Sequence, residues 1–211
     1  MREVTKTYKV YKFEELNEAA KSRVRDRIGH DVKECKCEIL EEYLGVELWE
    51  KYHISDCEIG YSLTHSQGDG FCFYNVDLIN IKTVKNKDLD NANPFEDYCI
   101  KHFTNEHLTM LEDYLEAYYL RVEKGNLPYQ HSHTCHIATE YYWDDTKAYK
   151  KQVNDFIDEL VGKFNKIYHT ICRDLERFGY DFIDDIYEDE IIAEIESREL
   201  EFLENGEEFY E

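Results

Sequence analysis

Between Asp144 and Phe178, apolar residues recur every three or four positions, and this pattern limits the folds that the chain can adopt. The spacing predicts one long α-helix with a wide apolar stripe. We expect Asp144 or Asp145 to cap its start and Gly179 to end it. The stripe consists of Val153, Phe156, Ile157, Leu160, Val161, Phe164, Tyr168, Ile171, Cys172, Leu175 and Phe178.

Two segment pairs show the two-residue alternation of antiparallel hairpins. Residues 57–65 and 71–81 flank the turn Ser66-Gln67-Gly68-Asp69-Gly70, and we expect both glycines to adopt positive φ. Residues 118–124 and 132–143 flank a second turn at Gly125-Asn126.

The remaining patterns complete an α+β fold class, with an antiparallel sheet built from hairpins and helices packed mainly on one face. We expect a single domain over residues 1–211, with 180–211 as a strongly acidic C-terminal segment. The other expected elements are a strand at 4–13, a helix from Glu14 to Gly29, a helix at 31–52 with a break at Gly45, a linker at 85–94, helices at 94–103 and 105–115, a short acidic helix at 184–196 and a last strand at 199–209.

The chain has 25 Lys and Arg against 47 Asp and Glu, a net charge of −22. Such a surface repels phosphate unless positive charge is segregated, which the sequence does not indicate, so we expect no direct nucleic-acid binding. The C-terminal segment 180–211 alone carries a net charge of −13, with apolar residues between the acids. This segment predicts either a solvated acidic face or a folded surface that imitates a nucleic-acid backbone in a basic groove of a partner. Its candidate partner-binding residues are Asp184, Asp185, Glu188, Asp189, Glu190 and Glu194.

The tip of the first hairpin supplies two further candidate partner-binding residues, Gln67 and Asp69. A polar loop tip is a good contact point. The alternative interpretation is a tight turn in which Asp69 accepts hydrogen bonds from local backbone N–H groups. The loop lacks the ligand pattern of an EF-hand and the Lys of a phosphate-binding loop.

Histidines cluster around the start of the last hairpin strand. On a strand, His131, His133 and Cys135 share one face, and with His65 or His136 they are weak candidates for a metal site. Side chains two residues apart on a strand are about 7 Å apart, which is awkward for tetrahedral coordination. We therefore expect no metal and no cofactor. The pattern shows no catalytic residues, which favours a protein that is not an enzyme.

The seven cysteines show no Cys-x-x-Cys spacing, and neither a signal peptide nor a membrane span is evident. We expect free thiols and a cytoplasmic location in a host cell.

Several segments resemble, in order, a group of small acidic proteins found on phages and other mobile elements. The most specific is Tyr61–Phe73, which contains Ser-Gln-Gly-Asp-Gly followed by an aromatic residue. The others are Tyr11–Lys21, Gly125–His133, Asp189–Glu194 and Glu201–Phe209. The chain departs from the group at Thr64-His65 and by an insertion around 88–116. The resemblance implies a role against host defence and supplies no catalytic residues.

These observations favour a phage-type inhibitor, anti-CRISPR or anti-restriction, that binds a host nucleic-acid-targeting protein or complex through an acidic surface. Two alternatives remain open. One is a metal-dependent enzyme or binding module centred on the two hairpins. The other is a homodimeric accessory protein in which two chains share the stripe of the long helix.

Overall fold

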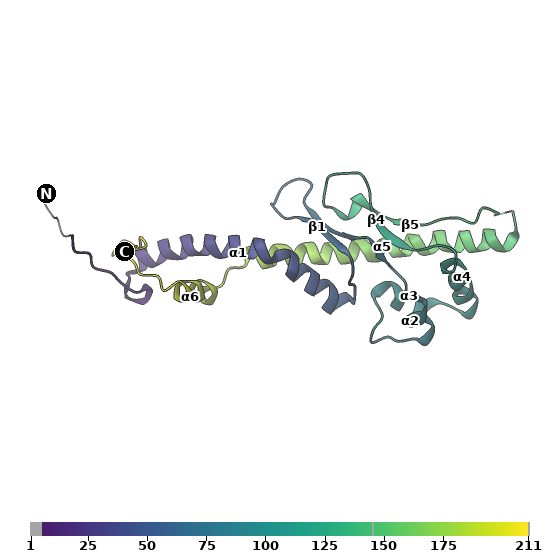
Figure 1. Cartoon of the computed structure of the whole chain (residues 1–211), viewed down its shortest axis with the longest axis horizontal. Coiled ribbons are helices and arrows are strands. Elements are labelled where there is room, and N and C mark those ends of the chain that lie inside the picture. The colour runs from purple at the N-terminus through teal and green to yellow at the C-terminus, as the bar shows by residue number, and fades with distance from the viewer. Residues whose placement is uncertain (1–5, 145, 211) are drawn as a thin grey trace, which may run out of the picture. The chain divides into compact units, whose positions relative to one another are not determined.

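The computed structural model describes residues 6–144 and 146–210, and the chain divides into two compact units. We call residues 1–40 with 181–211 the terminal unit, and residues 41–180 the central unit. Helices α1 (Glu18–Tyr52) and α5 (Ala148–Asp184) contribute residues to both (Figure 1). The expectation of a single domain is not tested by this division and stays a prediction.

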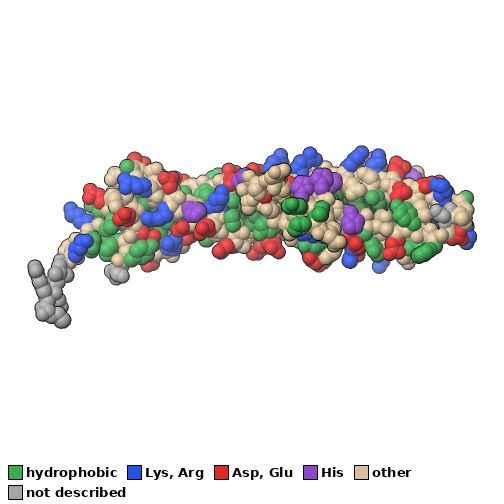
Figure 2. All heavy atoms as spheres, turned by 90° about the horizontal axis from the view of Figure 1, so that it is seen from above, with side chains coloured by type: hydrophobic (Ala, Val, Ile, Leu, Met, Phe, Trp, Pro, Cys, Tyr) green, Lys and Arg blue, Asp and Glu red, His purple; other side chains and the backbone are tan. Residues whose placement is uncertain are grey.

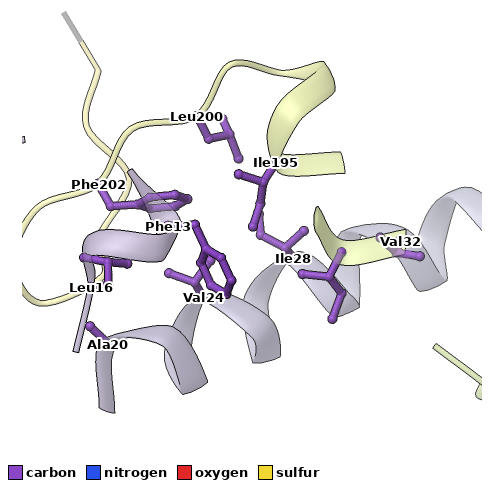
Figure 3. Packing of buried hydrophobic residues seen from close by; sticks show 10 residues of the cluster. Phe13, Leu16, Ala20, Val24, Ile28, Val32, Ile195, Leu200 and Phe202 are labelled. Atoms are coloured by element: carbon purple, nitrogen blue, oxygen red, sulfur yellow. The ribbon is translucent and has the colours of Figure 1, made fainter. Parts of the chain in front are cut away.

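The terminal unit is held by an apolar cluster between α1 and the C-terminal segment. Figure 3 shows side chains from α1 facing residues of α6 (Glu188–Ser197) and of the chain after it. On α1 the buried residues follow four-residue steps, which places them on one helix face. The cluster contains Phe13, Leu16, Ala20, Val24, Ile28, Val32, Ile191, Ile195, Leu200 and Phe202.

Within the described residues, neither of the two terminal strands expected from the sequence forms, and residues 4 and 5 of the first lie outside the described residues. Phe13–Glu15 is a short 3-10 helix, η1, and Tyr11 makes only an isolated antiparallel bridge to Phe202. A second isolated bridge joins Phe202 to Glu208. The alternating pattern is therefore satisfied by burial of Phe202 in the cluster, without an extended ladder.

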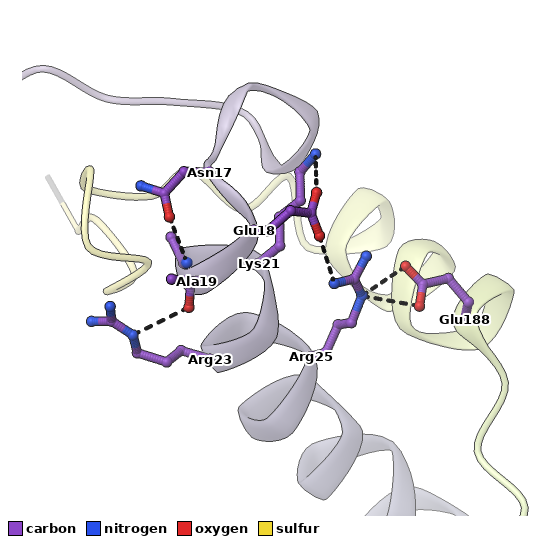
Figure 4. A network of polar contacts seen from close by, with 8 residues as sticks. Asn17, Glu18, Ala19, Lys21, Arg23, Arg25 and Glu188 are labelled. Atoms are coloured by element: carbon purple, nitrogen blue, oxygen red, sulfur yellow. Dashed lines mark hydrogen bonds and ion pairs between the residues drawn. The ribbon is translucent and has the colours of Figure 1, made fainter.

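Polar contacts fix the start of α1 (Figure 4). The Asn17 side chain accepts a hydrogen bond from the Ala20 N–H at 3.0 Å, as an N-cap residue does. Arg25 contacts Glu18 on its own helix and donates to Glu188 of α6 at 2.8 Å. The contact between Arg25 and Glu188 therefore joins helix α1 to helix α6 within the terminal unit.

Three glycines expected to interrupt helices lie inside continuous ones. Helix α1 runs through Gly29 and Gly45, and α5 runs through Gly179 to Asp184. A Cβ at Gly179 would collide with the Leu63 side chain, so the absence of a side chain here permits Leu63 to pack closely against α5. Packing of this kind outweighs the low helix propensity of glycine, which is about 1 kcal/mol.

Both hairpins are confirmed in the central unit. β1 (Glu58–Ser62) pairs antiparallel with β2 (Gly70–Tyr74), with Gly60 opposite Cys72. β4 (Arg121–Lys124) pairs antiparallel with β5 (Cys135–Ala138) and with the short β3 (Val76–Asp77). The second hairpin loop ends in a 3-10 turn, η2 (Ser132–Thr134).

Three short helices lie between the hairpins. α3 (Pro94–His102) and α4 (Asn105–Leu115) are confirmed. α2 (Ile81–Asn86) was not expected: it begins at the last residue of the expected strand 71–81 and includes only the first two residues of the expected linker 85–94. Glu96 is buried and accepts hydrogen bonds from the backbone N–H groups of Asn80 and Asn93, which fixes the start of α3. The short acidic helix predicted in the C-terminal segment is confirmed as α6. The predicted α+β class is confirmed.

The long helix α5 begins at Ala148, later than expected. Asp144 precedes it and accepts a hydrogen bond from Thr146, and Asp145 lies outside the described residues. The predicted stripe is largely covered by the chain's own residues, because Val153, Ile157, Phe164 and most of its other members are buried. The stripe is therefore not free to be shared between two chains, which was the basis of the homodimer alternative. None of the helices in the described chain combines the length and apolar composition that crossing a bilayer requires.

Candidate functional site

The Asp69 side chain lies inside the first hairpin turn. Its carboxylate accepts hydrogen bonds from the backbone N–H groups of Thr64 at 2.6 Å and Ser66 at 2.8 Å, and from the Tyr180 hydroxyl at 2.9 Å. The hydroxyls of Ser62, Thr64 and Ser66 also donate to it. Asp69 is only 8% exposed, so its carboxylate cannot contact a partner as the sequence suggested. The structure instead favours the alternative interpretation, a turn organised by this side chain.

These donors determine the charge of Asp69. Burial acts to raise the pKa of its carboxyl group, but the hydrogen bonds from Ser66, Tyr180 and Ser62 outweigh burial and lower the pKa below its ordinary value. The pKa of Tyr180 rises to about 12, through burial and through its hydrogen bond to Asp69. At neutral pH the turn therefore contains a carboxylate and a protonated phenol.

The rest of the tip divides into buried and exposed parts. Gly68 has φ 98°, as expected, whereas Gly70 does not adopt positive φ. A Cβ at Gly70 would lie 2.8 Å from the His131 ring, so this glycine is needed for packing. Gln67 is exposed and stays a candidate partner contact. His65 stacks on Tyr180, with ring centroids 4.6 Å apart.

Three histidine rings form a cluster beside the second hairpin. The ring centroids of His131 and His133 are 4.8 Å apart, and those of His133 and His169 are 4.5 Å apart. His169 on α5 also lies 3.0 Å from the Ser132 hydroxyl through its Nδ1. Burial lowers the pKa of His169, and the neighbouring His133 and His131 lower it further. His169 was not singled out in the sequence, because it belongs to a different element and lies far along the chain from the other two histidines.

Of the four weak metal candidates, only His131 and His133 lie together. His65 stacks on Tyr180, while His136 lies exposed on β5 opposite Glu123. Among residues 6–144 and 146–210, no three His, Cys, Asp or Glu side chains are placed to hold a metal ion. The geometry therefore gives no support to the metal-dependent alternative.

Cys135 and Cys172 lie beside the Tyr168 side chain, and Cys72 lies beside Cys135. Cys72, Cys135 and Cys172 are free, and the Tyr168 hydroxyl donates to the Phe73 carbonyl at 3.0 Å. Interaction with Cys72 lowers the pKa of Cys135 to about 6, with further help from Tyr168, Thr134 and Lys124. The pKa of Cys72 rises, because of Cys135 and burial. The sequence pattern did not indicate this group, since its members come from β2, β5 and α5.

The acidic C-terminal segment is partly neutralised inside the terminal unit. Four of the six candidate acids are paired: Asp184 with Lys33 at 2.7 Å, Glu188 with Arg25 at 2.8 Å, Glu190 with Lys36 at 2.7 Å and Glu194 with Arg198 at 3.6 Å. Burial opposes ionisation of Glu190, but hydrogen bonds from Lys36 and the Tyr187 N–H outweigh it and lower its pKa. These four residues help to fold the unit.

A second set of acids in the same segment is exposed. Within the described chain, seven carboxylates after residue 180 make no ion pair and accept no side-chain hydrogen bond. They include two of the candidates, Asp185 and Asp189, and we call the set the acidic face. Its members are Asp181, Asp185, Asp189, Glu196, Glu199, Glu204 and Glu207.

These features define an α+β protein with two β-hairpins, a buried carboxylate turn and an acidic face. The chain belongs to the family described as domain of unknown function DUF8835, whose model matches residues 30–190. Comparison with curated proteins and with solved structures found no match.

Proposed function

We propose that this protein is a non-enzymatic, phage-type inhibitor that binds a nucleic-acid-targeting defence complex of its host, in the cytoplasm, through the acidic face. The observation that carries the proposal is the concentration of charge in the terminal unit. This unit has 11 Lys and Arg against 22 Asp and Glu, a net charge of −11. The central unit, residues 41–180, carries the same net charge on a chain about twice as long, so the terminal unit has about twice its charge density.

The folding of the terminal unit supports this proposal. Its apolar cluster and its ion pairs hold the C-terminal segment in place, so the unpaired carboxylates are fixed on a folded surface. Fixed negative charges complement a basic groove that normally holds a nucleic-acid backbone. The resemblance to phage proteins supports an anti-defence role, and Gln67 offers a second contact on the central unit.

The test reverses charge on the acidic face without touching the paired acids. A purified host effector captured by the protein is assayed for binding and inhibition. The variant replaces Asp185, Asp189, Glu196 and Glu204 with Lys. The control makes the same charge change in the central unit, at the exposed residues Glu41, Glu42, Glu50 and Asp90.

We expect the acidic-face variant to bind at least about ten-fold more weakly, because it loses four complementary charges and adds four repulsive ones. The control should retain inhibition. Equal loss in both variants, or binding that does not change between low and high salt, would contradict the proposal because exposed charges are screened by salt.

A further inference from the structure

A stripe of positive charge lies on α5, although the protein as a whole is strongly acidic. Lys163, Lys166, Arg173 and Arg177 follow one another at steps of three, seven and four residues, which places them on one side of the helix. All four are exposed, and none makes an ion pair within the described residues. We call these four residues the basic stripe.

The middle of the basic stripe has no acid beside it on its own helix. From residue 160 to residue 173 the sequence contains no Asp or Glu. The first acid after this interval is already engaged, because Asp174 accepts a hydrogen bond from the Tyr52 hydroxyl at 3.0 Å. Between Lys163 and Arg173, therefore, α5 supplies no carboxylate that would neutralise the stripe.

The histidine cluster borders the basic stripe. His169 lies between Lys166 and Arg173 on α5, and the exposed His133 ring is 4.5 Å from it. Figure 2 shows histidine side chains gathered on one face of the molecule with Lys and Arg side chains beside them. Tyr129, on the same loop as His133, is 57% exposed. Positive charge and accessible rings are thus neighbours in the central unit.

This arrangement has the composition of a surface that binds a single nucleic-acid strand, where cations contact phosphates and rings stack on bases. At 1.5 Å per residue, the basic stripe extends over about 21 Å. A stacked strand has one phosphate per about 3.4 Å, so this length matches about six phosphates.

We propose that the basic stripe of α5 binds the phosphate backbone of single-stranded nucleic acid, with the His133 and Tyr129 rings contacting bases. Summing charge over the whole chain led to the expectation of no nucleic-acid binding, but the structure segregates four unpaired cations on one helix face. The inference concerns the central unit and does not depend on the acidic face.

The test measures fluorescence anisotropy of labelled 12-nucleotide oligouridine and oligothymidine with the full-length protein, from about 25 mM to about 200 mM NaCl. We expect the logarithm of the association constant to fall with the logarithm of salt concentration, with a slope of about −3 for four contacts on a single strand. Tighter binding of oligouridine would assign the site to RNA, and tighter binding of oligothymidine would assign it to DNA.

A matched pair of variants locates the site. The first replaces Lys163, Lys166, Arg173 and Arg177 with Gln. The control replaces four exposed lysines elsewhere on the central unit, Lys82, Lys101, Lys147 and Lys151, with Gln. Circular dichroism is recorded for both, so that loss of binding is compared between folded proteins.

We expect the basic-stripe variant to bind at least about ten-fold more weakly with a flatter salt dependence, and the control to stay within about two-fold of the unmodified protein. Equal binding by the two variants would overturn the proposal. So would failure of the unmodified protein to bind either oligonucleotide at low salt. If poly-glutamate binds as tightly as the oligonucleotides, the stripe recognises an acidic protein surface and the nucleic-acid assignment is wrong.

Discussion

At the residue scale, the turn around Asp69 shows that a local sequence pattern predicts the turn but not all the hydrogen-bond donors to its carboxylate. The sequence motif predicted a tight turn, and the local donors Thr64 and Ser66 confirm it. The hydroxyl of Tyr180, 111 residues away, completes the set of donors. No period or spacing in the sequence points to such a contact, because it depends on where α5 packs. The same reason explains why His169 and the thiols around Tyr168 were not predicted.

Replacing Asp69 with Asn should lower the melting temperature at neutral pH. The amide removes the charge that the donors stabilise and brings an N–H₂ group among hydrogen-bond donors. Because the pKa of Asp69 is lowered in the folded state, its contribution is complete above its ordinary pKa, near 3.9, and is lost as pH falls through the lower folded value.

Thermal melts from about pH 7 to about pH 2.5 check this expectation. The difference in melting temperature between the unmodified protein and the variant should shrink below about pH 4. Gln67→Ala serves as the control, since Gln67 is exposed and its removal should change little. A constant difference across this range would show that the carboxylate charge does not stabilise the turn.

Backbone conformation gives a second prediction at this scale. Gly206 has φ 84°, and a Cβ there would lie 2.8 Å from the Ala20 carbonyl oxygen. Gly206→Ala should therefore destabilise the terminal unit by about 1 kcal/mol or more. The control is Gly162→Ala on α5, where a Cβ meets nothing within 4 Å, and where the change should stabilise by up to about 1 kcal/mol. Urea unfolding measures the change in unfolding free energy for each variant. Destabilisation by both substitutions would contradict the argument.

At the element scale, periodicity predicted the elements that are long or that pair locally. Both hairpins and the buried side of α5 follow from alternation and from three- and four-residue spacing. Over the described residues, the strands expected near the two ends were wrong, because Phe13, Leu200 and Phe202 are buried in the apolar cluster and only isolated bridges form there. The basic stripe was readable from the spacing of Lys163, Lys166, Arg173 and Arg177. The net charge of the whole chain does not reveal such a local arrangement of cations on one side of a helix.

The cluster in the terminal unit gives a prediction for a whole element. Phe202, on the segment after α6, is fully buried in the cluster with residues of α1, so Phe202→Ala should cost about 3 kcal/mol or more of unfolding free energy. Hydrogen exchange read by mass spectrometry should show faster exchange in α6 and in residues 198–210. Leu203→Ala, at a partly exposed neighbouring position, is the control. Unchanged exchange in α6 would mean that the cluster does not hold the C-terminal segment.

At the scale of the whole molecule, the excess of acids matters more than any single ion pair. With 47 acids and 25 bases, pairing every base would still leave 22 negative charges. Surface ion pairs such as Lys101–Asp97 and Lys151–Asp155 contribute at most about 1 kcal/mol each and are weakened by salt. Repulsion among the unpaired acids is also weakened by salt, and it opposes folding. The response of stability to salt therefore reports which of the two effects is larger.

We expect repulsion to dominate, so that added salt stabilises the protein. Raising NaCl from about 0.01 M to about 0.1 M shortens the Debye length from about 30 Å to about 10 Å, which screens the many distant acid–acid pairs while contacts near 3 Å lose less. A gain of about 1 kcal/mol corresponds to a rise of about 2–4 °C in melting temperature for a chain of this size. The variant with Lys at Asp185, Asp189, Glu196 and Glu204 has a net charge of −14 and should show a smaller rise. A melting temperature that falls with salt in both proteins would mean that the ion pairs contribute more to stability than the acidic excess removes.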